Sequence, residues 1–132
     1  MNVDKVVQYW TESAAEDWPV AMYLLDSGAH QYALFFGHLY LEKLLKALVV
    51  SRTGLHAPRT HNLLFLAERA GLSVSPQQHE VLLRITAYNI DTRYPDDVEA
   101  TQRRYTRAYT EEELRIIEEI SQWLKSELNH EN

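Results

Sequence analysis

Apolar side chains recur along the chain at steps of three and four residues, the spacing of one face of an α-helix. The first such pattern runs from Val3 to Asp26 and is followed by Ser27 and Gly28, where glycine suits a left-handed C-terminal cap. Pro19 lies inside this pattern and lacks the N–H of a helix interior, so we expect a kink or a break there. No segment has the alternation typical of a half-buried strand. The pattern therefore predicts an all-helical protein.

The segment predicted to form the second helix, residues 31–51, is the most apolar part of the chain, with the run YALFFGHLYLEKLLKALVV. Apolar residues occur on nearly all sides of it, interrupted mainly by His38, Glu42, Lys43 and Lys46. A helix that is apolar on most faces is covered by several neighbours or by a second subunit. We therefore expect a central helix. Because its apolar surface exceeds what a small bundle easily covers, we also expect a homodimer.

Turn and cap signals divide the rest of the chain. Residues 52–60 are typical of a loop, and a short helix is predicted over residues 61–70. Ser75, followed by proline and Gln78, is a capping box that begins another helix, which we expect to end near Asn89.

The last helix is predicted from a second capping box, Thr110 to Glu113, with Thr110 as the cap. Residues 90–109 then form a connection of about 20 residues, long for a bundle, in which residues 98–107 favour a helix. The predicted fold is an up-and-down four-helix bundle with an additional short helix, in one domain over residues 1–132.

Composition narrows the environment of the protein. The chain has no cysteine, which removes disulfides, thiolate metal sites and cysteine nucleophiles. The N-terminal MNVDKVVQYW lacks the long apolar core of a signal peptide, and no stretch approaches the roughly 20 apolar residues of a membrane span. We therefore expect a cytoplasmic protein. The net charge of −6 argues against strong non-specific binding to a nucleic-acid backbone but leaves room for a local basic site.

Metal chemistry finds little support in the spacing of possible ligands. A carboxylate-bridged di-metal bundle uses two Glu-x-x-His units, and only Glu127 to His130 has that spacing. His38 and Glu42 share a helix face, but two ligands do not make a site. The four glycines are isolated, so no glycine-rich phosphate loop is present. We expect neither a metal nor a cofactor.

Two groups on or near the apolar helix are candidates for chemistry. Glu42 and Lys46, spaced i,i+4, suit a surface ion pair, and Lys43 and Lys46 could alternatively offer positive charge to a phosphate. His61 comes where a helix is predicted to begin. It suits either a capping position or proton transfer.

The segment Arg93-Tyr94-Pro95-Asp96 is the third candidate. Arg93 offers a planar donor fork for phosphate, and Tyr94 a ring that can stack on a base. The alternative is that Arg93 pairs with Asp91 or Asp96 and pins the loop to the bundle.

The order of these motifs resembles the HEPN domain family. The resemblance spans nearly the whole chain, and its sharpest points are Glu42-Lys43-x-x-Lys46-Ala47, Pro58-x-x-His61-x-Leu63 and Tyr88 through Asp96. It implies a helical bundle, generally dimeric, of a kind often encoded beside a minimal nucleotidyltransferase as a toxin–antitoxin pair. Some members of the family are metal-independent ribonucleases, and others bind nucleotides or act as non-catalytic partners.

The catalytic branch of that family carries an arginine followed, after four to six residues, by a histidine. This motif is not present here: three residues separate Arg52 from His56, and one separates Arg59 from His61. Position 62 is Asn62, where an acidic residue is common in the family. Whether the protein is an enzyme is therefore left open.

The leading hypothesis is a HEPN protein that binds a nucleotide or RNA segment and works with a minimal nucleotidyltransferase. Its expected contacts are Arg93 and Tyr94 with phosphate and base, Lys43 and Lys46 as supporting charge, and Asp91 and Asp96 as orienting groups. The alternatives are a metal-independent ribonuclease that uses His61 or Tyr88 with Arg93, and a structural module in which the 91–97 loop clasps a dimer.

Overall fold

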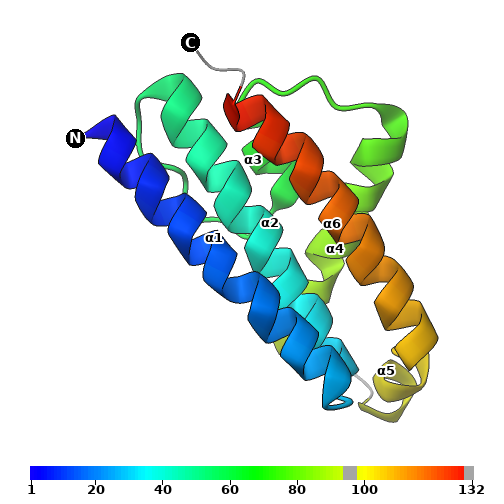
Figure 1. Ribbon diagram of the computed structural model, residues 1–132. Helices are drawn as coiled ribbons and strands as arrows, with labels where there is room; N and C mark the ends of the chain where they lie inside the picture. The colour runs from blue at the N-terminus through cyan, green and yellow to red at the C-terminus, as the bar shows by residue number, and fades with distance from the viewer. Residues whose placement is uncertain (94–97, 130–132) are drawn as a thin grey trace.

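The computed structural model describes residues 1–93 and 98–129. That part of the chain holds six helices and no strand (Figure 1): α1 Val3–Asp26, α2 His30–Thr53, α3 Leu63–Arg69, α4 Pro76–Arg93, α5 Val98–Arg104 and α6 Arg107–Asn129. The four long helices, α1, α2, α4 and α6, run in alternating directions, with α3 and α5 as short additions. The predicted all-helical, up-and-down bundle is confirmed.

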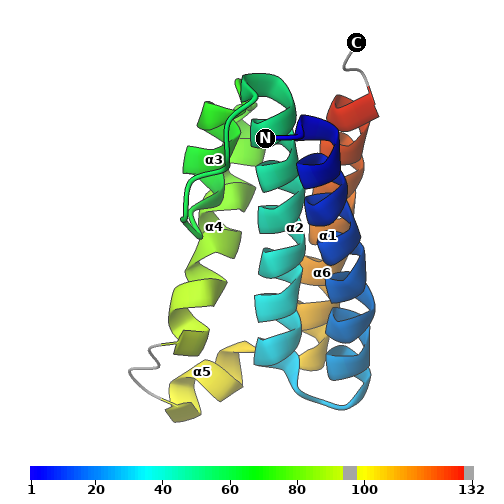
Figure 2. The same ribbon diagram turned by 90° about the vertical axis from the view of Figure 1, so that its left-hand side faces the viewer.

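Helix α2 is the centre of the bundle, with α1, α3, α4 and α6 packed around it (Figure 2). Its leucines Leu34, Leu41, Leu45 and Leu48 are completely buried. Burial of one leucine side chain contributes about 1.5–3 kcal/mol, so α2 supplies much of the core's stability. The prediction of a central helix is confirmed.

The structure changes the argument for a dimer. The apolar faces of α2 are already covered within one chain, so this helix does not need a second subunit. Large apolar side chains are exposed elsewhere, among them Tyr9 and Tyr23 on α1 and Leu83 and Ile90 on α4. Homodimerisation therefore stays a prediction, but the apolar surface of α2 no longer supports it.

Helix α1 continues through Pro19 without the break that the sequence suggested. Pro19 is exposed, so the carbonyl that loses its donor can bind water. Ala14, Ala21 and Leu25 are buried in the contact between α1 and α2, and this packing holds both halves of the helix in place.

The second half of the chain is more helical than predicted. Helix α4 ends at Arg93 rather than near Asn89, and α6 begins at Arg107 rather than after Thr110. The predicted cap is wrong, because the N–H of Tyr109 donates to Oγ1 of Thr106 (3.2 Å). The hydroxyl of Thr110 instead lies buried inside the helix and donates to the carbonyl of Thr106 (2.7 Å).

The other helix starts are set by local caps. The Ser75 capping box is confirmed: the N–H of Gln78 donates to Oγ of Ser75 (3.0 Å), and the N–H of Ser75 donates to Oε1 of Gln78 (2.9 Å). Helix α3 begins two residues later than predicted, because Oδ1 of Asn62 accepts from the N–H of Phe65 (3.1 Å). His61 therefore lies in the connection before α3.

Glycine at position 37 allows α2 and α6 to approach closely. A Cβ atom there would lie 2.8 Å from Cδ1 of Ile117 and 3.2 Å from Cδ2 of Leu114. Both side chains belong to the buried core, so neither can readily move away.

Within residues 1–93 and 98–129, no helix is sufficiently long and apolar to cross a membrane.

Candidate functional site

Five side chains gather on the side of α2 that faces α3 and α4, and we call them the His61 cluster. Phe35, His38 and Glu42 lie at steps of three and four residues along α2. His61 comes from the connection before α3, and Arg93 is the last residue of α4. The cluster thus joins three segments that are far apart in the sequence.

The imidazole of His61 is held by a carboxylate and is half-exposed. Nδ1 of His61 lies 2.7 Å from Oε1 of Glu42, and 49% of the His61 side chain is exposed. A carboxylate accepts hydrogen bonds, so the proton sits on Nδ1 and Nε2 remains for a ligand. This is the arrangement of an oriented acid–base histidine.

The carboxylate of Glu42 is buried, and Lys46 compensates its charge. Only 4% of Glu42 is exposed, and its Oε2 lies 3.0 Å from Nζ of Lys46. The ammonium of Lys46 also lies 5.2 Å from the centroid of the Trp10 ring. Glu42 and Lys46 therefore form the expected ion pair, but it is buried and does not lie on the surface.

His38 holds the backbone of His61 while Glu42 holds its ring. Nε2 of the fully buried His38 donates to the carbonyl of His61 (2.8 Å). Burial lowers the pKa of His38, and the nearby charges of His61 and Arg93 lower it further, against the opposing effects of that hydrogen bond and of Glu42. His38 is thus kept neutral, and two side chains one turn apart on α2 fix His61 in one orientation.

Arg93, at the end of α4, stacks on Phe35, which lies about one helical turn from His38 on α2. Its guanidinium carbon is 5.2 Å from the centroid of the Phe35 ring, and its Nε donates to Oδ1 of Asn89 (2.8 Å). Its charge contributes to lowering the pKa of His38, so it acts within electrostatic range of that ring. Through Phe35, and through His38 and Glu42, Arg93 and His61 both contact the same side of α2.

The alternative in which Arg93 pairs with Asp91 is not what the structure shows. Asp91 instead accepts from Nη1 of Arg104 (3.0 Å) and from the hydroxyl of Tyr105 (2.7 Å), which ties α4 to the end of α5 and to the residue that follows it. Asp91 therefore does not orient Arg93. Tyr94 and Asp96, the other expected contacts, lie outside the described residues.

The two lysines of α2 are engaged by acidic side chains. Nζ of Lys43 lies 2.8 Å from Oδ2 of Asp17 on α1, and Lys46 is paired with Glu42. Lys43 is thus part of a separate contact between α1 and α2. Lys46 reaches the His61 cluster only through Glu42.

Tyr88 belongs to a different buried group. Its hydroxyl donates to Glu113 of α6, which also accepts from Nε of Arg84 (2.7 Å). Burial, and then the hydrogen bond to Glu113, raise the pKa of Tyr88 far above its usual value. Its phenol stays protonated, so Tyr88 is poorly suited to act as a base.

Sequence reasoning missed how Glu42 and His38 hold His61. Their spacing on one helix face is visible in the sequence, but it does not show that His61, which lies in another segment, contacts them both. Among residues 1–93 and 98–129, no three His, Asp or Glu side chains are grouped to hold a metal ion. The chemistry that this geometry offers is proton transfer by His61, with the cation of Arg93 on the same side of α2.

Comparison with known proteins bears on the identity of the chain. The search of curated proteins and the search of solved structures each returned no match. The model of the HEPN domain family matches residues 7–128, a span that includes every residue of the His61 cluster. The chain therefore belongs to the HEPN domain family.

Proposed function

We propose that the protein binds the phosphate of a nucleotide or of an RNA segment at the His61 cluster. The observation that carries this proposal is the half-exposed His61, held through Nδ1 by buried Glu42, on the same side of α2 as Arg93. Membership of the HEPN family supports a role connected with nucleotides or RNA in general.

The geometry supports phosphate as the group bound. Arg93 presents a planar set of donors at the end of α4, and the ring of Phe35 beneath it limits how the guanidinium can turn. Nε2 of His61 accepts a proton from a phosphate monoester or, when protonated, donates to a phosphate oxygen. Because Arg93 and His61 can both donate to one phosphate, binding does not require a broad positive surface. This acidic chain has no such surface charge to offer.

The proposal includes the assembly in which the protein acts. HEPN domains often dimerise, and exposed apolar residues on α1 and α4 are suited to a protein contact. We extend the proposal to a homodimer that works with a minimal nucleotidyltransferase, as the family resemblance implies. Co-purification of the two proteins from one host, and light scattering of this chain alone, test the two parts separately.

Binding is tested by fluorescence anisotropy with a short labelled RNA and by competition with adenosine monophosphate. His61→Ala should weaken binding by about tenfold, since a charge-assisted hydrogen bond contributes about 1.5 kcal/mol. His79→Ala is the matched control, because His79 is an exposed histidine on α4 outside the cluster. Equal binding by both variants would contradict the proposal.

A second function, RNA cleavage without a metal, is favoured by the contact between Glu42 and His61. Nε2 of His61 would take the proton of a 2′-hydroxyl, whose oxygen attacks the adjacent phosphorus as the bond to the 5′-oxygen of the next nucleotide breaks. The departing 5′-oxygen would take a proton from water, and His61 would release its own proton to solvent. The products would be a 2′,3′-cyclic phosphate and a 5′-hydroxyl, and Arg93 would stabilise the charge that develops on the phosphorane. RNA that stays intact in the presence of chelator and of wild-type protein would contradict this function while leaving the binding proposal standing.

A further inference from the structure

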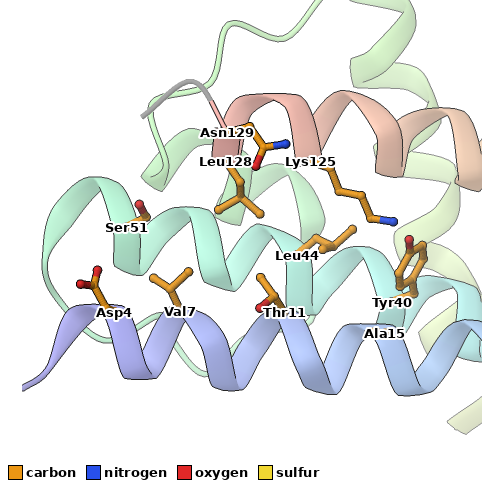
Figure 3. A pocket seen from close by; sticks show the side chains of 10 residues that line it. All are labelled: Asp4, Val7, Thr11, Ala15, Tyr40, Leu44, Ser51, Lys125, Leu128 and Asn129. Carbon is orange, nitrogen blue, oxygen red and sulfur yellow. The ribbon is translucent and has the colours of Figure 1, made fainter. Parts of the chain in front are cut away.

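A cavity lies on the other side of α2, away from the segments that form the His61 cluster. It has a volume of about 550 Å³ and is lined by α1, α2 and α6 (Figure 3). Pockets that hold small organic ligands are usually of this size. None of its lining residues belongs to the His61 cluster.

The packing of the helices explains why the cavity forms. Helices α1 and α6 both pack against α2, much more than against each other. Their side chains therefore leave a trough whose floor is α2, with Tyr40, Leu44 and Ser51 along it. The lining residues of α1 run from Asp4 to Ala15, a length of about 16 Å at the helical rise of 1.5 Å per residue.

Three aliphatic side chains line the trough, together with the polar side chain of Thr11. Val7 on α1, Leu44 on α2 and Leu128 on α6 face into it from its three sides (Figure 3). Such a lining, long in one direction, suits an extended hydrocarbon chain, whose transfer from water contributes about 0.8 kcal/mol per buried methylene.

The two ends of the trough differ in charge. At one end the ammonium of Lys125 lies 5.4 Å from the centroid of the Tyr40 ring. No ion pair joins Lys125 to a carboxylate in the described part of the chain, in contrast to Lys43 and Lys46. Asp4 lies at the opposite end (Figure 3). An anionic head group is attracted by Lys125 and repelled by Asp4, so the charges fix its direction in the trough.

We propose that this cavity binds a free amphipathic monoanion, a carboxylate on an aliphatic chain of medium length. The carboxylate meets Lys125 beside Tyr40, and the chain lies along Val7, Leu44 and Leu128. This site is separate from the His61 cluster and does not depend on the proposed function.

Decanoate is the probe, added to the full-length protein below its micelle concentration and followed by calorimetry and by backbone amide NMR. We expect saturable binding, with the largest shifts at amides that line the trough, such as Thr11 and Leu44. Lys125→Gln should weaken binding by about tenfold, the loss of roughly 1.4 kcal/mol of charge-assisted contact. Lys5→Gln, which changes an exposed lysine of α1 outside the cavity, should leave binding unchanged.

Two further measurements complete the test. Ala15→Phe, with folding checked by circular dichroism, places a ring at the wall of the trough and should abolish binding. Decanol and decylammonium should bind at least several-fold more weakly than decanoate, since neither carries an anion for Lys125. Absence of saturable binding, equal affinity for decylammonium, unchanged affinity in Lys125→Gln, or binding only to anionic phospholipid vesicles would each overturn the proposal.

Discussion

Glu42 on α2 and Glu113 on α6 are both only 4% exposed, and each accepts from a cation and from a second polar side chain. The partners of Glu113 are Arg84, Tyr88 and Tyr109. Arg84 uses two nitrogens, with Nε 2.7 Å from Oε1 and Nη2 3.1 Å from Oε2. This group joins α4 to α6, and the hydrogen bond from Tyr88 to Glu113 is buried.

Glu42 differs from Glu113 because one of its partners, His61, remains accessible to a ligand. Lys46 neutralises the carboxylate from within the bundle, while His61 carries the contact out to the surface, where half of its side chain is exposed. The same chemistry, a buried acid with a cation and a ring, stabilises the fold at Glu113 and orients an accessible group at Glu42. The exposure of the partner, rather than the burial of the acid, separates a structural network from a candidate site.

The largest expected effect is on stability, at Glu113. Glu113→Ala leaves Arg84 and the buried hydroxyl of Tyr88 without their acceptor and should lower the free energy of unfolding by about 3 kcal/mol. Urea unfolding measures this. Glu111→Ala, which removes an exposed partner of Arg107, is the matched control and should change stability by less than about 0.5 kcal/mol. Similar losses in the two variants would remove the basis for treating Glu113 as a buried network.

Glu42→Gln should lower both stability and ligand binding. The amide keeps the size of the side chain but leaves buried Lys46 without a counter-charge, which should cost about 2 kcal/mol of unfolding free energy. It also removes the carboxylate that holds the proton on Nδ1 of His61, so RNA binding should weaken as well. Unfolding curves and anisotropy titrations on one preparation measure both. A loss of stability with unchanged binding would mean that Glu42, like Glu113, has only a structural role.

Arg93→Ala should affect binding and leave stability nearly unchanged. A guanidinium that meets phosphate contributes about 1–3 kcal/mol to binding, whereas this exposed arginine adds little to the native state. Arg103→Ala, which removes an exposed arginine of α5, is the control. If Arg93→Ala destabilises the fold without weakening RNA binding, Arg93 has a structural role and does not contact the phosphate.

The smallest expected effect is a pH dependence from His38. Because its pKa is lower in the folded protein than in the unfolded chain, the unfolded chain takes up the proton first as the pH falls. The contribution of neutral His38 to the free energy of unfolding is complete above about pH 6.5, the pKa of histidine in the unfolded chain. It is lost as the pH falls below that value, by at most about 1.4 kcal/mol per pH unit. Urea midpoints between pH 7.5 and 5 should fall less steeply in His38→Gln than in the wild type. Parallel curves would contradict a buried neutral His38.

The same contrast explains what the sequence could predict. Helical periodicity and the Ser75 capping box are local signals, and they predicted the bundle, its central helix and the start of α4. The acid at position 113 follows the local rule for a capping box, yet its hydrogen-bond partner Arg84 is 29 residues away. Likewise, the partner that gives Glu42 its significance, His61, is 19 residues away in the next segment. Tertiary packing overrides the local cap rule at Glu113 and adds a distant partner to the local ion pair of Glu42 with Lys46, and a single sequence does not display such pairings.

The central claim is that Glu42 presents His61 to a phosphate beside Arg93. The most direct test follows the histidine ring signals by NMR while adenosine monophosphate is added. We predict that the His61 signal shifts in a saturable way, that the exposed His79 signal stays in place, and that Arg93→Ala weakens the His61 response by about tenfold. A His61 signal that stays unchanged while the nucleotide binds elsewhere on the protein would contradict the claim.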